Sequence, residues 1–165
     1  LLSILSFSQY DDAIEVHNIA RELRPNLSID LDNAKFYGYK IVEIKYDSIL
    51  SEKAKNRADL LTQEFFNYHD GDNVFNFWFV EISEDENGEK VFENDNTYLI
   101  NASKDWATID IDLDTYNDIN NKKPMEIRDG DLSDLFNLVG YYNTRVGFAI
   151  SKSDKHVFVV ACYGN

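Results

Sequence analysis

Two short segments near the C-terminal end of the chain carry an apolar residue at every second position. This is the pattern of a β-strand that buries one face. The segments span residues 146–150 and 157–165, and the polar residues 151–156 between them form a turn. The residues expected on the buried faces are Val146, Phe148 and Ile150 in the first strand, and Val157, Val159 and Ala161 in the second. The sequence therefore predicts a β-hairpin here.

Three other segments show apolar residues at helical spacing instead. The first begins near Asp12 and ends before Pro25, and the second begins at Asp47 or Ser48 and ends near Tyr68. The third immediately precedes the hairpin. The expected apolar stripes are Ala13, Val16, Ala20 and Leu23 in the first helix; Leu50, Ala54, Arg57, Ala58, Leu61 and Phe65 in the second; and Leu135, Phe136, Leu138, Val139 and Tyr142 in the third.

An unusually aromatic strand is predicted over residues 75–82. The Asn87-Gly88 dipeptide is a turn signal, so residues 90–92 are expected to pair back as a hairpin. Alternation places Phe75, Phe77 and Phe79 on one side of the strand and Trp78 with Val80 on the other. Both sides are apolar. The strand is either buried on both faces or presents an aromatic patch to a partner, because aromatic residues dominate interface anchors.

Composition limits the classes of protein that the chain can represent. Its 165 residues and 44% hydrophobic content fit one domain, which we place at residues 10–165. The formal net charge of -14 disfavours nucleic acid and anionic lipid surfaces, and it suits a cationic protein partner or simple solubility. The only cysteine, Cys162, excludes an intramolecular disulfide, and its place on an apolar strand predicts a buried thiol.

The first nine residues resemble the end of a signal peptide. Apolar residues lead into Ser6 and Ser8, which predicts export; the alternative is an apolar segment packed on the domain. Sequons at Asn26 and Asn101 are compatible with export. No apolar run is long enough to span a bilayer, so an integral membrane protein is not expected.

Several motifs occur in the order found in the CAP superfamily of venom allergens, plant pathogenesis-related proteins and cysteine-rich secretory proteins. They are His17-Asn18 with Arg21, residues 44–47 leading into the alanine-spaced helix, Gly71-Asp72-Asn73-Val74, Trp106, and the final helix with its hairpin. The resemblance spans residues 13–165. It implies an α/β fold, namely a three-layer α-β-α sandwich with a small antiparallel sheet. It also marks residues 75–97 as a hairpin insertion and asks for helix from Trp106 onward. Cysteine-poor relatives face the cytosol or the Golgi, which is the alternative to secretion.

The resemblance also implies a cleft with two histidines and two acidic residues, sometimes around zinc. The matching positions are His69, Asp72, either Ile109 or Asp112, and Leu135. Leu135 replaces a histidine and Asp72 is one methylene shorter than glutamate. We therefore expect a degenerate tetrad with no metal, no cofactor and no catalytic residue, since a closed zinc site needs about four ligands. His17 is expected to be a packed residue that orients Asn18 and Arg21, and His156 to be solvated.

No nucleophile motif, phosphate-binding loop or metalloprotease motif is present. Sterol-binding relatives place aromatic residues in a loop where this chain has residues 116–125, and only Tyr116 matches. The predicted function is that of a secreted, non-catalytic domain that binds a protein partner, through the aromatic residues Phe75, Phe77, Trp78 and Phe79 and an acidic rim that favours a basic partner. The alternatives are a carrier of fatty acid or sterol, and a metal-dependent hydrolase with a degenerate site.

Overall fold

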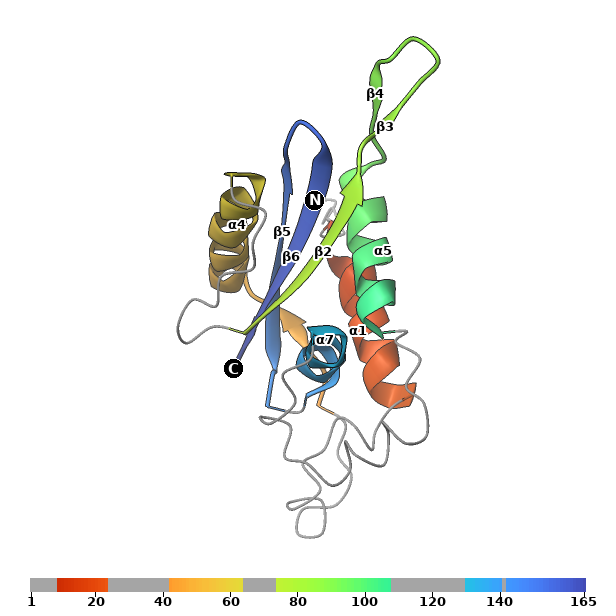
Figure 1. The fold of residues 1–165 in the computed structure, drawn as a ribbon. Coiled ribbons are helices and arrows are strands. Elements are labelled where there is room, and N and C mark those ends of the chain that lie inside the picture. The colour runs from red at the N-terminus through yellow and green to blue at the C-terminus, as the bar shows by residue number, and fades with distance from the viewer. Residues whose placement is uncertain (1–8, 24–41, 64–73, 108–129, 141) are drawn as a thin grey trace, which may run out of the picture.

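The computed structural model describes residues 9–23, 42–63, 74–107, 130–140 and 142–165. A four-stranded sheet in the order β1-β5-β6-β2 forms its centre, and a separate two-stranded sheet pairs β3 with β4 (Figure 1). The helices are α1 (Asp11–Leu23), α4 (Ser48–Gln63), α5 (Asp95–Ala107) and α7 (Gly130–Val139). The strands are β1 (Lys45–Tyr46), β2 (Val74–Glu81), β3 (Ser83–Glu84), β4 (Lys90–Val91), β5 (Arg145–Lys152) and β6 (His156–Gly164).

The predicted C-terminal hairpin is confirmed as β5 and β6, which pair antiparallel with Ala149 opposite Val160. All six residues expected on one face lie in or against a single core cluster together with Leu135, Leu138 and Val139. Cys162 is buried on the opposite face of β6, as predicted. Alternation along two strands was a reliable guide here because both strands lie in the middle of the sheet and each face meets a separate core.

Helices cover both faces of the sheet, so the three-layer α-β-α prediction is confirmed. α4 packs on β5 and β6 from one side, while α1, α5 and α7 contact one another and form the opposite layer (Figure 1). The sheet is mixed rather than antiparallel throughout, because the two-residue strand β1 pairs parallel with β5. We call the two sides the α4 face and the three-helix face.

α4 is held close to the sheet by its first turn. The Asp47 carboxylate accepts hydrogen bonds from the backbone N–H groups of Ile49 (2.8 Å) and Leu50 (3.1 Å), so Asp47 is the cap of the two candidates, Asp47 and Ser48, that the sequence left open. The backbone N–H of Phe148 donates to Ser51 Oγ at 2.9 Å. A Cβ atom on Gly147 would lie 2.0 Å from the Ser51 nitrogen, so this contact between helix and strand requires glycine. The predicted stripe is confirmed further along, where Ala54, Arg57, Ala58 and Leu61 are buried.

The buried face of α1 differs from the apolar stripe predicted for it. Ala13 and Ala20 are buried as expected, but their buried neighbours are His17 and Arg21, and Val16 is only half-buried. The apolar stripe was the wrong guide because the three-helix face offers hydrogen-bond partners from β6 and from the end of α7 to two polar side chains. α1 ends at Leu23, before Pro25, as predicted.

β2 is a full member of the central sheet, paired with β6 from Val74 to Glu81. Beyond it the predicted hairpin is present, with Ser83 opposite Val91 and Gly88 at a positive φ of 76°. It extends away from the sheet (Figure 1). α5 begins at Asp95, so Trp106 lies near the end of this helix and not at its start. The helix expected beyond Trp106 falls on residues that lie outside the described part of the chain. The expected insertion, residues 75–97, comprises most of β2, the hairpin and the first turn of α5.

Candidate functional site

The four positions of the expected tetrad are only partly described. His69, Asp72, Ile109 and Asp112 lie outside the described residues. Leu135 is fully buried in the core of the three-helix face and offers no atom that could bind a metal. Within the described ranges, no group of three or more His, Cys, Asp or Glu side chains could hold a metal ion. The absence of a zinc site from the whole domain therefore stays a prediction.

His17 belongs to a buried polar network on the three-helix face of the sheet. Its Nδ1 lies 2.8 Å from the carbonyl oxygen of Ala13, and its Nε2 lies 2.9 Å from the hydroxyl of Tyr163. The Asn76 amide also donates to this hydroxyl, at 3.1 Å. A carbonyl can only accept, so Nδ1 carries the proton and Nε2 accepts from Tyr163. Burial lowers the pKa of His17 to about 4 and raises that of Tyr163, so the pair is neutral at pH 7.

This histidine does not orient its neighbours as predicted. Asn18 instead bonds both backbone groups of Ile44, accepting from its N–H at 2.9 Å and donating to its carbonyl at 3.3 Å. Because His17 and Tyr163 are enclosed by the core, their contact positions α1 on β6 and is closed to a substrate. His156 is half-buried against the Phe79 and Phe158 rings, so its expected solvation is incomplete.

Arg21 is the second buried polar side chain that α1 contributes to the three-helix face, with 1% of its surface exposed. Its guanidinium donates to four backbone carbonyls, those of Leu138, Val42, Gly140 and Asn143, at 2.7–3.2 Å. Burial lowers its pKa to about 10, which leaves the group charged at neutral pH. The arrangement joins α1 to the end of α7 and to the segment before β1, and it identifies the His-Asn-x-x-Arg motif as structural.

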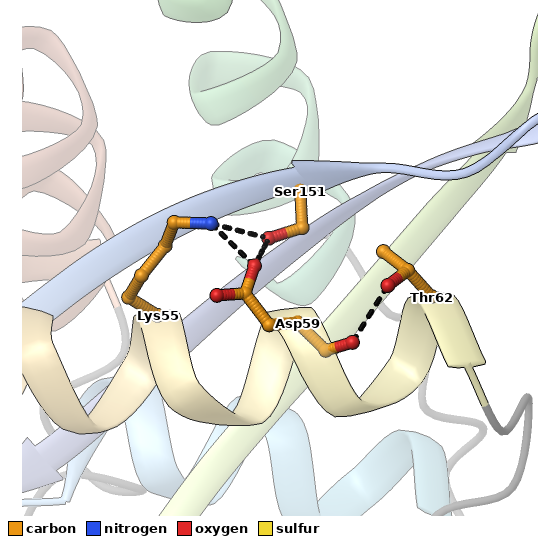
Figure 2. A network of polar contacts seen from close by, with 4 residues as sticks. All are labelled: Lys55, Asp59, Thr62 and Ser151. Atoms are coloured by element: carbon orange, nitrogen blue, oxygen red, sulfur yellow. Dashed lines mark hydrogen bonds and ion pairs between the residues drawn. The ribbon is translucent and has the colours of Figure 1, made fainter.

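A hydroxyl, a carboxylate and an ammonium meet where α4 passes over β5 (Figure 2). Ser151 Oγ donates to the Asp59 carboxylate at 2.5 Å, and Lys55 Nζ donates to both Asp59 and Ser151, the latter at 3.0 Å. Hydrogen bonds from Lys55 and Ser151 lower the pKa of Asp59. A carboxylate held in its charged form by these bonds is a poor base, and a lysine that donates to it cannot take a proton from serine. The cluster fastens α4 to β5.

The four candidate residues of the aromatic strand lie in different surroundings. Phe75 and Phe77 are half-buried and pack against the core of the α4 face. Trp78 points to the three-helix face, where its ring lies 6.4 Å from that of Tyr98 and its Nε1 donates to Asp105 at 2.6 Å. Phe79 is the exposed member, with 53% of its surface accessible. Phe79 is therefore the best placed of the four for contact with a partner.

The β3–β4 hairpin is the most exposed segment that the structure describes, since every residue from 83 to 95 is exposed. Its turn is well ordered: the Asp85 carboxylate accepts from the backbone N–H groups of Asn87 (2.8 Å) and Glu89 (2.9 Å). Val91 and Phe92 keep 51% and 45% of their surface accessible. The hairpin thus presents carboxylates and apolar side chains together on a fixed backbone. Before α5 begins at Asp95, the hairpin's carboxylates are Glu84, Asp85, Glu86, Glu89 and Glu93.

Arg57 was expected only to contribute to an apolar stripe, yet it is the most unusual polar side chain of the α4 face. It is 5% exposed, and its guanidinium carbon lies 5.8 Å and 5.6 Å from the ring centroids of Phe75 and Phe77. Its Nε and Nη2 atoms are buried without a hydrogen-bond partner among the described residues. Cation–π contacts contribute about 0.5–2 kcal/mol, whereas one unsatisfied buried donor costs about 1–3 kcal/mol. The rings therefore do not replace the missing acceptors.

The fold has counterparts among solved structures. A crystal structure of hookworm platelet inhibitor aligns with a TM-score of 0.59 and 18% identity, covering 98% of this chain and 71% of that one. NaASP2, solved with Zn²⁺, aligns with a TM-score of 0.56 and 18% identity over 96% of this chain and 80% of that one. Na-ASP-1 aligns with a TM-score of 0.56 and 15% identity, over 94% of this chain and 38% of that one. The likeness to these three structures shows that this chain has the fold of the CAP superfamily.

At these identities the likeness concerns the fold alone. No protein-family model and no curated protein matches the sequence. Of the helices in the described ranges, none is long and apolar enough to cross a membrane.

Proposed function

We propose that this chain is a non-catalytic CAP-fold domain that acts by binding a protein partner through the β3–β4 hairpin. The observation that carries the proposal is the exposure of every residue from 83 to 95 around an ordered turn. A preorganised surface loses little conformational entropy on binding, so its contacts contribute more fully to affinity. Apolar Val91 and Phe92 supply area that can be desolvated, and the hairpin carboxylates surround them.

The charge of the hairpin favours a basic partner. Lys90 is its one cation against five carboxylates, and Lys90 lies 3.8 Å from Asp154 on the β5–β6 turn. A cluster of one sign speeds association with the opposite sign and repels acidic competitors. We therefore expect association to slow as salt concentration rises.

Two polar clusters described above support a function without catalysis, because neither offers an accessible base or nucleophile. The His17–Tyr163 pair is sealed in the core, and Ser151 donates to a carboxylate that hydrogen bonds hold in its charged form. One structural counterpart is named for inhibition of platelets, and binding without catalysis is compatible with such a role. We further propose that the domain is exported, on the basis of the N-terminal pattern and the sequons.

The test compares two variants with equal change in charge. The hairpin variant carries Glu84→Gln, Glu86→Gln and Glu89→Gln and keeps Asp85, which builds the turn. The control carries Glu15→Gln, Glu22→Gln and Glu52→Gln, which are exposed carboxylates on α1 and α4. Both variants and the wild type are immobilised and exposed to the same tissue extract, and the retained proteins are quantified by mass spectrometry.

We expect at least one protein to be retained equally by the wild type and the control and to be reduced about tenfold by the hairpin variant. Adding Phe92→Ser should abolish its retention. If every retained protein is lost equally from both variants, overall charge explains the binding and the hairpin proposal fails. Turnover of peptide, ester or phosphoester substrates by the purified wild type would contradict the non-catalytic part.

A further inference from the structure

Arg57 presents one complete edge of its guanidinium without an acceptor in the described residues. The two atoms concerned, Nε and Nη2, lie on the same side of the planar group. Their N–H bonds point in parallel, which is the fork that accepts both oxygens of a carboxylate or two oxygens of a phosphate. Imperfect packing could leave any two of the guanidinium N–H groups without an acceptor, whereas here the two unpaired groups are the ones that together bind a carboxylate or phosphate.

The described residues around the guanidinium do not supply the acceptor. Phe75 and Phe77 cover the face of the guanidinium, and both belong to an apolar cluster that includes Ala58, Leu61 and Val160. The nearest described carboxylate on α4, Asp59, is already bonded to Lys55 and Ser151. Both unpaired nitrogens are also closed to solvent, so bulk water does not satisfy them. A buried cation in this state is a strong attractor for an anion.

We propose that Arg57 anchors an anion-binding site between α4 and β2, which takes the carboxylate or phosphate oxygens of a ligand through the Nε–Nη2 edge. The Phe75 and Phe77 rings hold the guanidinium plane in place, which fixes the direction of the fork. Because the two rings and the cluster they pack against are apolar, a bound anion is shielded from water on that side and its hydrogen bonds to Arg57 are strengthened. The site is independent of the β3–β4 hairpin and does not rest on the function proposed for it.

The experiment follows the thermal unfolding midpoint and the heat of binding during titration with sodium acetate, sodium octanoate or sodium phosphate. Sodium chloride holds the ionic strength constant. The three probes distinguish a bare carboxylate, a carboxylate on an apolar chain and a phosphate. We expect a saturable rise in the midpoint with at least one of them, because a ligand that binds only the folded state stabilises it.

Three variants show whether Arg57 is the anchor. Arg57→Met should reduce the affinity for that probe by at least about tenfold, and Arg57→Lys should do the same because it keeps the charge but loses the fork. The matched control is Arg145→Met, which removes a half-exposed arginine that pairs with Asp47 at 3.5 Å. The control should bind as the wild type does. Circular dichroism of each variant confirms that the fold is retained.

Several results would overturn the proposal. It fails if no probe gives saturable binding to the wild type, or if Arg57→Lys binds as tightly as the wild type. Equal loss in Arg57→Met and Arg145→Met would show that the effect is one of overall charge.

Discussion

The two faces of the central sheet each bury an arginine, and they treat it in opposite ways. On the three-helix face, Arg21 is 1% exposed and donates to four backbone carbonyls. On the α4 face, Arg57 is 5% exposed, lies over two phenylalanine rings and has two nitrogens without a partner in the described residues. Equal burial therefore does not mean an equal role.

The difference follows from what packs on each face. The three-helix face contains the end of α7 and the segment before β1. Backbone carbonyls in these places are not used within a helix or sheet. Arg21 satisfies these carbonyls and is satisfied by them. Arg57 lies in the middle of α4, which packs on β5 and β6, and the backbone groups within the helix and between these two strands are already paired. Arg57 has no acceptor for two of its nitrogens among the described residues, which makes it the better candidate for a ligand-binding residue.

The strongest change in stability is expected at Arg21. Arg21→Met should lower the free energy of unfolding by about 3–5 kcal/mol, because it removes four hydrogen bonds to backbone carbonyls. Of these carbonyls, only that of Gly140 keeps a second donor within the described ranges, the backbone N–H of Asn143 at 3.0 Å. Urea denaturation measures this change. Arg145→Met, at a half-exposed ion pair, should lower it by less than about 1 kcal/mol. A loss below about 1 kcal/mol for Arg21→Met would show that its four hydrogen bonds are not structural.

The next effect concerns the close approach of α4. Gly147→Ala should destabilise the domain by about 3 kcal/mol, since its Cβ would lie 2.0 Å from the Ser51 nitrogen and 2.2 Å from the Leu50 carbonyl carbon. The control is Gly164→Ala, whose Cβ would lie 3.5 Å from the Leu50 side chain and should cost less than about 1 kcal/mol. Thermal unfolding of both variants tests the pair. Equal stability of the two would mean that α4 shifts freely on β5.

Because His17 is buried, we expect the free energy of unfolding to depend on pH. Its folded pKa of about 4 is below the unfolded value of 6.5, so the unfolded chain binds the proton first. The stabilising contribution is complete above pH 6.5 and is lost as the pH falls toward 4. We expect a loss of about 2 kcal/mol between pH 7.5 and 5, measured by urea denaturation. In His17→Asn this part of the pH dependence should vanish; an unchanged profile would assign it to other groups.

The weakest change in stability is expected at Arg57. Arg57→Met should change the free energy of unfolding by less than about 1 kcal/mol in chloride buffer, and it can be stabilising, because replacing an unpaired buried charge with an apolar side chain removes its desolvation cost. The measurement is again urea denaturation, beside Arg21→Met. A loss as large as that of Arg21→Met would show that Arg57 has a strong internal partner, and the contrast between the faces would disappear.

Much of the architecture could be predicted from the order of apolar and polar residues. Alternation placed Val146 and Val159 on the same face of the C-terminal hairpin, helical spacing gave the buried stripe around Ala54, and Asn87-Gly88 marked a real turn. These predictions succeeded because strand period, helix period and turn conformation are local properties of the backbone. The resemblance carried by scattered motifs led to the CAP fold, which the structural counterparts confirm.

Less of the candidate site could be predicted, because partners distant in sequence decide the state of a polar group. The position of His17 on α1 does not reveal that Tyr163 binds it, and nothing around Trp78 shows that Asp105 and Tyr98 hold it on the inner side. Helical spacing placed Arg57 in a buried stripe, but the two unpaired nitrogens follow only from the packing of α4 on β5 and β6, which brings Arg57 over Phe75 and Phe77 of β2. Local sequence was sufficient to specify most of the helices, strands and turns. Only the packed fold specifies which buried polar groups are satisfied, since desolvation and hydrogen bonding depend on every neighbour at once.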